Sequence, residues 1–197
     1  MGKKAKKKDD TAILPTAGES LAKLERLVRL MRQQGHAEGL NPAQWEALRY
    51  LGRANRLSNT PGAVARFLGS TKGTVSQTLS SLETKGLISK KLNSTDNRFV
   101  ALLLTETGAQ ILAKDGLKAL GADIDLLKPK IRKRFDRAIA ELLAAEVQRQ
   151  GEPSFGTCQT CRYFREATSN NSASCMKVSA ELAEAEIGLL CVEHVGR

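Results

Sequence analysis

Residues 60–104 constrain the fold more than any other stretch of the sequence. Thr60, followed by proline, is a typical helix start, because threonine caps free backbone N–H groups and proline fits the first helical position. Gly69 predicts the end of that helix, and a second helix over 71–85 follows and stops at Gly86. Two short apolar runs around a polar tip then predict a β-hairpin. The pattern indicates a helix-turn-helix with a wing.

Amphipathic helices flank this stretch and make the predicted fold mainly α with a small β-hairpin. Apolar residues at helical spacing predict one helix over 21–31, and Asn41 caps the next. A fifth helix follows Thr105 and carries the apolar residues Ile111, Leu112 and Leu120. The last helix runs from Pro129 to about Gln150. These long helices exceed what a small core needs, so we expect their spare apolar faces to pair across a two-fold axis in a homodimer.

The charge of the chain is high and unevenly distributed. The formal net charge is +10 and the pI is about 9.7. Residues 1–150 hold 27 Lys and Arg against 15 Asp and Glu, whereas residues 151–197 hold four against six. A basic balance favours a polyanionic partner. We expect a disordered basic arm over 1–16, a main domain over 17–150 and a separate module over 151–197.

Membrane insertion and secretion have no support in the sequence. No apolar run reaches the roughly 18–20 residues needed to span a bilayer, and the basic N-terminus lacks the apolar core of a signal peptide. We therefore expect a cytoplasmic protein without a membrane partner, in which disulfides are the less favoured use of cysteine.

The exposed face predicted for the helix over 71–85 carries groups that suit nucleic acid. These are one amine, one amide and four short hydroxyls: Lys72, Thr74, Ser76, Gln77, Ser80 and Ser81. Such side chains donate to phosphates and read base edges in the major groove. Lys90 and Lys91 add positive charge on the adjoining hairpin. The alternative is an ordinary solvated helix, which the neighbouring basic hairpin disfavours.

Two motifs give the chain a family resemblance. Leu87-Ile88-Ser89-Lys90-Lys91 is followed by Asp96-Asn97-Arg98 and then by Leu104-Thr105-Glu106-Thr107-Gly108. Residues 17–150 thereby resemble the MarR family of winged helix-turn-helix regulators. The resemblance implies a dimer, a recognition helix in double-stranded DNA, and a wing whose Arg98 enters the minor groove. Asp96 would orient Arg98 or pair with a nearby basic residue. The resemblance also implies a small-molecule ligand pocket between the dimer helices and the DNA-binding lobe.

The module after residue 150 contains every cysteine of the chain: Cys158, Cys161, Cys175 and Cys191. A C-x-x-C turn can present two thiolates to one metal ion. A module with little apolar mass needs a disulfide or a bound metal ion to be stable. Zinc is the first expectation, an iron–sulfur cluster the second and a thiol switch the third. In an alternative zinc site, Cys191 and His194 form the second pair of ligands, and Cys175 is not a ligand. Phe155 and Leu190 are expected among the apolar residues around the site.

Other functions are less well supported. The chain has two histidines and no phosphate-binding glycine loop, so we expect no enzyme activity. A thiol-redox protein lacks the expected βαβ context around the C-x-x-C pair. A non-specific architectural DNA-binding protein is the stronger rival to a sequence-specific transcriptional regulator, which would respond to a metal, redox or small-molecule signal.

Overall fold

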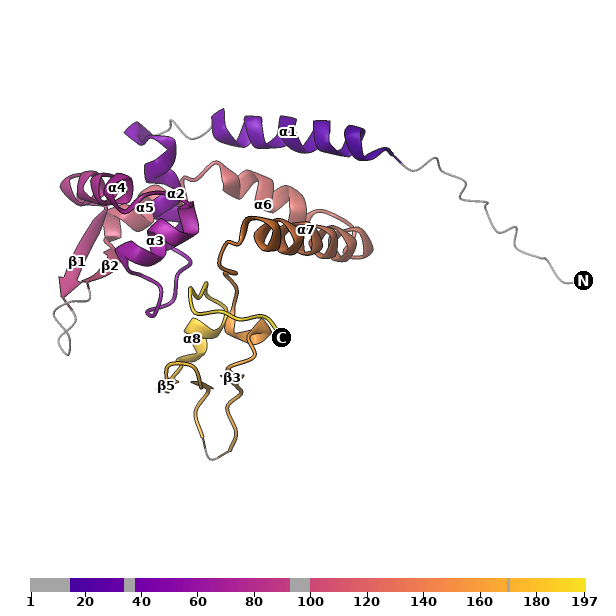
Figure 1. Cartoon of the computed structure of the whole chain (residues 1–197). Coiled ribbons are helices and arrows are strands. Elements are labelled where there is room, and N and C mark those ends of the chain that lie inside the picture. The colour runs from indigo at the N-terminus through magenta and orange to yellow at the C-terminus, as the bar shows by residue number, and fades with distance from the viewer. Residues whose placement is uncertain (1–14, 34–37, 93–99, 170) are drawn as a thin grey trace, which may run out of the picture.

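A computed structural model describes residues 15–33, 38–92, 100–169 and 171–197 (Figure 1). The main part of the chain contains these helices and strands: α1 (Ala17–Gln33), α2 (Pro42–Leu51), α3 (Pro61–Leu68), α4 (Lys72–Thr84), β1 (Ile88–Leu92), β2 (Val100–Leu104), α5 (Glu106–Ala113), α6 (Leu117–Asp125) and α7 (Pro129–Gln150). The basic arm predicted over 1–16 lies almost wholly outside the described residues.

Side-chain caps fix the starts of four helices where the sequence predicted them. The Asn41 carboxamide accepts a hydrogen bond from the Gln44 N–H at 2.9 Å, and the Gln44 side chain accepts one from the Asn41 N–H at 3.0 Å. Thr60, Thr71 and Thr105 each accept a backbone hydrogen bond at 3.0–3.2 Å in the same way. Each cap contributes about 1 kcal/mol of helix stability.

The turn between α3 and α4 depends on Gly69. This residue has φ 57°, in the left-handed region that glycine adopts without steric cost, and its N–H donates to the Ala65 carbonyl. The chain therefore reverses within three residues, and α4 begins at Lys72 against α3. This tight turn confirms the helix-turn-helix predicted for 60–85.

One core joins the helices to the hairpin. Its largest fully buried side chains come from α2, α3, α4 and both strands: Trp45, Leu48, Tyr50, Val64, Leu79, Leu82, Ile88 and Leu102. The hairpin is antiparallel, with Ile88 opposite Leu104 and Leu92 opposite Val100. Because Ile88 and Leu102 are buried, the base of the hairpin is fixed to the helices.

Gly108 brings α5 against the start of the hairpin. A Cβ added at this residue would lie 2.0 Å from the Leu87 carbonyl oxygen. The Thr105 hydroxyl accepts the Gly108 N–H and donates to the Gly86 carbonyl at 2.6 Å. In the Leu104-Thr105-x-x-Gly108 motif, the threonine hydroxyl therefore links the start of α5 to Gly86 by hydrogen bonds. The glycine allows α5 to pack closely on Leu87.

The prediction of one fifth helix carrying Ile111, Leu112 and Leu120 was wrong. The structure has two helices there, and Leu120 belongs to α6. Asp115 separates them, because its carboxylate accepts the Leu117 N–H at 3.0 Å and two hydrogen bonds from Arg49 at 2.7 Å each. The break depends on a partner in α2, which periodicity does not reveal.

Helices α1, α6 and α7 extend away from the core (Figure 1). The apolar side chains of α1 and α7 are exposed in the single chain: Leu21, Leu24, Leu27, Val28, Leu30, Ile131, Phe135, Ile139, Leu142 and Leu143. In the ranges that the structure describes, no helix has both the length and the apolar character needed to cross a membrane.

The C-terminal module is a small unit beside the winged helix (Figure 1). It contains a 3₁₀ turn, a three-stranded antiparallel sheet and a short helix: η2 (Cys158–Thr160), β3 (Phe164–Arg165), β4 (Ser174–Cys175), β5 (Ala180–Glu181) and α8 (Glu184–Ile187). Phe164, Ala173 and Leu182 form a second small core with Cys158, Cys161 and Cys175.

The module is docked on the loop between α2 and α3. The Leu190 N–H donates to the Arg53 carbonyl at 2.7 Å, and the Asn55 N–H donates to the Leu190 carbonyl at 2.9 Å. Val192 is buried in the main core, and its N–H donates to the buried Ser58 hydroxyl at 2.8 Å. The segment that follows α8 is thus part of the winged-helix core.

Phe155 and Leu190 do not surround the cysteines as expected. Phe155 packs edge-to-face on Phe67 and Tyr50, with ring centroids 5.0 and 6.1 Å apart. Leu190 also packs on the main core. These aromatic partners lie in α2 and α3, so local sequence could not identify them.

Candidate nucleic-acid interface and the cysteine cavity

Helix α4 presents its polar face to solvent. Val75, Leu79 and Leu82 are buried against the core, which fixes the rotation of the helix. Five of the predicted contact residues are exposed on the remaining surface: Lys72, Thr74, Ser76, Gln77 and Ser80. An exposed helix face with these donors and acceptors has the chemistry for base edges and phosphates.

Ser81 differs from the other five residues. Its side chain is half-buried, and its hydroxyl accepts a hydrogen bond from the Gln44 amide at 2.8 Å. The Lys85 ammonium group donates to the Gln44 side chain at 3.2 Å and to the Gly39 carbonyl at 2.6 Å. Ser81 and Lys85 therefore hold the C-terminal part of α4 on α2, contacts that sequence reasoning missed.

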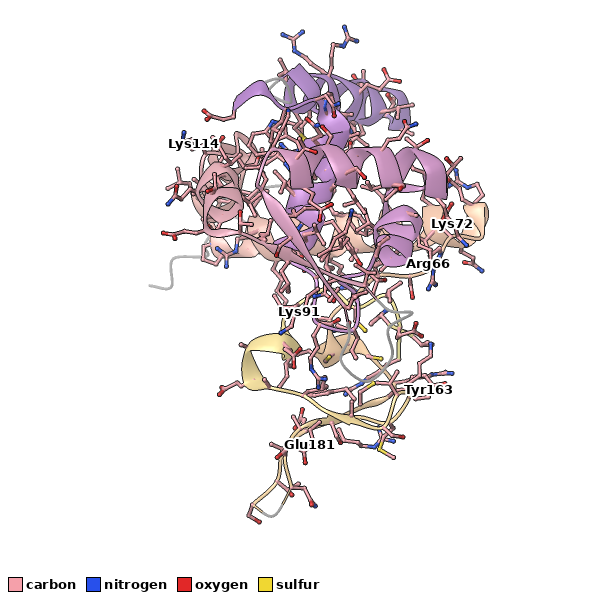
Figure 2. All side chains as sticks on the ribbon, turned by 90° about the vertical axis from the view of Figure 1, so that its left-hand side faces the viewer. Arg66, Lys72, Lys91, Lys114, Tyr163 and Glu181 are labelled. Carbon is pink, nitrogen blue, oxygen red and sulfur yellow. The ribbon has the colours of Figure 1, made fainter. Side chains whose placement is uncertain are left out.

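The basic residues around α4 have different surroundings. Lys90 lies on β1 and forms an ion pair with Glu83 of α4 at 2.5 Å, whereas Lys91 is exposed. Arg66 and Lys72 lie on the same side of the domain (Figure 2), where both line a hollow of about 590 Å³ beside the C-terminal module. Asp96 and Arg98, the predicted wing residues, lie outside the described residues.

A second hollow lies between α1 and the winged helix. It has a volume of about 410 Å³ and combines apolar walls with charged groups: Val28, Met31, Pro42, Glu46, Arg49, Arg53, Phe67, Leu68 and Leu117. This is the region for which the family resemblance implies a ligand pocket.

The four cysteines come from three segments of the module and line one small cavity. Each is a free, buried thiol. The cavity has a volume of about 10 Å³, and its other walls are Leu57, Phe164, Leu182 and Glu193. Burial, followed by the nearby Cys191, Cys175 and Cys161, raises the pKa of the Cys158 thiol to about 11. Cys175 therefore lines the cavity together with the other three cysteines, unlike in the alternative site in which it is not a ligand.

His194 lies outside this cavity. One ring nitrogen is 3.0 Å from the Thr160 hydroxyl, and the other is 3.3 Å from the Ser154 hydroxyl. Burial lowers the pKa of the imidazole. A Cβ on Gly156 would lie 2.6 Å from the same ring, so the imidazole packs closely on the linker. These contacts give His194 a structural place between the linker and η2.

Within the described part of the chain, no three Cys, His, Asp or Glu side chains stand in an arrangement that holds a metal ion. The cysteine cavity is thus a shared pocket of four thiols rather than a formed coordination shell.

The helix-turn-helix, the hairpin and the exposed polar face of α4 define a winged helix-turn-helix protein. Residues 38–98 match the family model described as the MarR family. The match ends before α5 and does not include the cysteines. A comparison with curated protein sequences gave no match.

Solved structures support the same fold. A mutant form of Staphylococcus aureus MepR is 19% identical, with a TM-score of 0.52, over 66% of this chain and 98% of that chain. The S. aureus MepR–DNA complex has 19% identity and a TM-score of 0.51, over 67% and 99%. A MarR transcriptional regulator from Methanosarcina mazei Go1 has 16% identity and a TM-score of 0.51, over 66% and 96%.

Proposed function

We propose that this protein is a non-enzymatic transcriptional regulator that binds double-stranded DNA sequence-specifically through α4. The observation that carries the proposal is the exposed row of Lys72, Thr74, Ser76, Gln77 and Ser80 on the second helix of a helix-turn-helix. The similar MepR fold has been solved as a DNA complex, which supports the same use of this surface. Such a function would place the protein in the cytoplasm.

The DNA-binding form is proposed to be a homodimer. Ten large apolar side chains of α1 and α7 are exposed in the single chain, and a second copy is the partner that covers the same faces on both molecules. A two-fold dimer presents two α4 helices to two half-sites of a palindrome.

A small-molecule signal is also proposed. The hollow of about 410 Å³ between α1 and the winged helix is lined by apolar side chains together with Glu46, Arg49 and Arg53. A ligand there would contact both the dimerisation helices and α2, so its binding could change the spacing of the two α4 helices.

Selection from a random duplex library, followed by titration of the selected site, tests the proposal. We expect the selected palindrome to bind at least about 10³-fold more tightly than random duplex at fixed salt. Equal affinity for both would instead favour the architectural DNA-binding protein. Disulfide-reductase activity, abolished by Cys158→Ser, would favour the thiol-redox alternative.

Two variants of α4 separate base reading from phosphate contact. Gln77→Ala should cost about 1–3 kcal/mol on the selected site and relax specificity at one position. Lys72→Ala should weaken binding to all sequences. It should also reduce the steepness with which the logarithm of the binding constant falls with the logarithm of the salt concentration by about 1. Gln110→Ala, which removes an exposed glutamine from α5, is the matched control and should leave both quantities unchanged.

A further inference from the structure

The cysteine cavity connects three segments that share little other structure. Cys158 and Cys161 belong to the η2 turn, where the Cys161 N–H donates to the Cys158 carbonyl at 3.0 Å. Cys175 lies on β4, and Cys191 follows α8. The strands of this sheet are two residues long, and the apolar core around the thiols is small. A module of this kind needs a bond between its segments to be stable.

The size of the cavity favours a single ion. A volume of about 10 Å³ accommodates roughly one water-sized sphere. An iron–sulfur cluster is much larger, so Phe164 and Leu182 would have to move outward to admit it. Four thiolates are soft ligands, and four of them around one ion form a common structural zinc site. Each cysteine can turn its sulfur toward such an ion by rotation about one side-chain torsion.

We propose that Cys158, Cys161, Cys175 and Cys191 bind one zinc ion, and that this ion holds the segment 190–192 against the loop before α3. Zinc occupancy would thereby regulate the DNA-binding domain. The zinc site stands on the cavity alone, whereas its regulatory consequence rests on the function proposed above.

The coupling follows from the position of Cys191 between two docking residues. Leu190 forms two backbone hydrogen bonds with Arg53 and Asn55, and Val192 donates to Ser58 and enters the main core. The Ser58 carbonyl accepts the Tyr50 hydroxyl at 2.8 Å inside that core. A ligand bond at Cys191 therefore restrains the loop from which α3 starts.

An ion pair reinforces the docking from α8. Arg56, on the same loop, pairs with Glu186 at 3.0 Å and also donates to the Glu181 carbonyl. Burial acts to raise the pKa of Glu186, but hydrogen bonds that its carboxylate accepts from the Ala183 N–H and from Arg56 hold it below its usual value. The loop between α2 and α3 is thus held at two places by segments that the proposed zinc ion joins.

Metal analysis of the full-length protein tests the site. Protein purified under reducing conditions without chelators should contain about one zinc per chain by mass spectrometry. Cys158→Ser and Cys191→Ser should each reduce zinc to well below one equivalent. Met176→Ser is the matched control, since this exposed side chain lies next to Cys175, and it should retain zinc.

Three results would overturn the zinc assignment. Stoichiometric iron with absorption near 400 nm would show that the four cysteines hold an iron–sulfur cluster instead of a zinc ion. A mass lower by about 2 Da for each cysteine pair, without metal, would indicate disulfides. Reduced protein that contains no zinc and takes up none in a titration with zinc chloride would rule out a metal site altogether.

Hydrogen exchange of the wild-type protein tests the coupling between zinc binding and the loop before α3. It needs no substitution, so the result does not depend on whether a variant folds. Removing zinc with a chelator should accelerate exchange at the Asn55, Leu190 and Val192 amides about tenfold or more, and added zinc should reverse it. Amides within α4 are the internal control for an intact helix. Unchanged exchange in zinc-loaded and zinc-free protein would overturn the coupling.

DNA affinity is measured separately on the same two forms. Zinc-loaded protein that binds the selected palindrome more tightly than stripped protein would support regulation. Equal affinity of the two forms would overturn regulation while leaving the zinc site intact. Zinc-loaded protein with normal exchange but no DNA binding would instead contradict the proposed function.

Discussion

Arg49 and Asp115 form an ion pair with two hydrogen bonds of 2.7 Å at the junction of α5 and α6. Only 8% of the Asp115 side chain and 15% of the Arg49 side chain remain exposed. The Asp115 carboxylate also accepts the Leu117 N–H, so one side chain ends α5, starts α6 and fixes both to α2. The direction in which α6 leaves the winged helix therefore depends on this pair.

Removing the charge of Asp115 should destabilise the protein strongly at neutral pH. Asp115→Asn leaves Arg49 without its partner in a largely buried place, and we expect a loss of about 3 kcal/mol in the free energy of unfolding by urea at pH 7. Asp125→Asn is the matched control, because Asp125 is 75% exposed in its pair with Arg132, and it should change stability by less than about 1 kcal/mol.

The same pair should make stability depend on acid pH. Burial acts to raise the pKa of Asp115, but hydrogen bonds from Arg49 and Leu117 and nearby positive charge hold it below its usual value. A lowered pKa in the folded state adds stability above the unfolded value of about 3.9, and this is lost as the pH falls through the folded value. The difference between wild type and Asp115→Asn should shrink at pH 3. A constant difference would contradict the assignment.

Gly108→Ala should destabilise the joint between α5 and the hairpin. The added methyl group would lie 2.0 Å from the Leu87 carbonyl oxygen, and backbone cannot yield as a flexible side chain can. We expect a loss of about 2 kcal/mol or more in thermal or urea unfolding. Gly121→Ala has open space around it in α6 and should be neutral or slightly stabilising. Equal effects of the two changes would refute the packing argument.

Leu24→Glu should weaken the proposed dimer. Leu24 is in the middle of the apolar stripe of α1 and is 43% exposed in the single chain, so a dimer would bury two uncompensated carboxylates. We expect the dissociation constant, measured by analytical ultracentrifugation, to rise at least about 100-fold. Ala22→Glu adds the same charge on the opposite side of α1 and should leave the dimer intact.

Arg98→Ala should weaken operator binding without affecting the dimer. An arginine at the tip of a wing suits a narrow and electronegative minor groove. We expect about a tenfold loss of affinity at moderate salt, measured by fluorescence anisotropy, with an unchanged dissociation constant of the dimer. Arg162→Ala, in the C-terminal module, controls for the loss of one charge. Unchanged DNA affinity in Arg98→Ala would exclude the wing contact.

Local signals in the sequence predicted the helices well. Asn41, Thr60, Thr71 and Thr105 cap helices through their nearest neighbours, so the starts of these helices follow from a few adjacent residues. The exposed face of α4 was predictable for the same reason, since Val75 and Leu79 fix its rotation by their spacing.

Features that depend on distant partners were not predictable. Asp115 breaks the fifth helix because Arg49 is nearby in space, and Ser81 faces Gln44 across 37 residues. Phe155 joins the main core because Tyr50 and Phe67 meet it there. No periodicity within a single segment encodes such contacts.

The hydrogen bond from Val192 to Ser58 spans 134 residues of the chain. At translation rates of about 5–20 residues per second, Ser58 emerges from the ribosome on the order of ten seconds before its partner exists. Contacts closed over so long a loop form late, and until then the core of the helix-turn-helix lacks Val192. During that interval, the exposed face of α4 belongs to a winged helix whose loop before α3 is not yet held by the C-terminal segment.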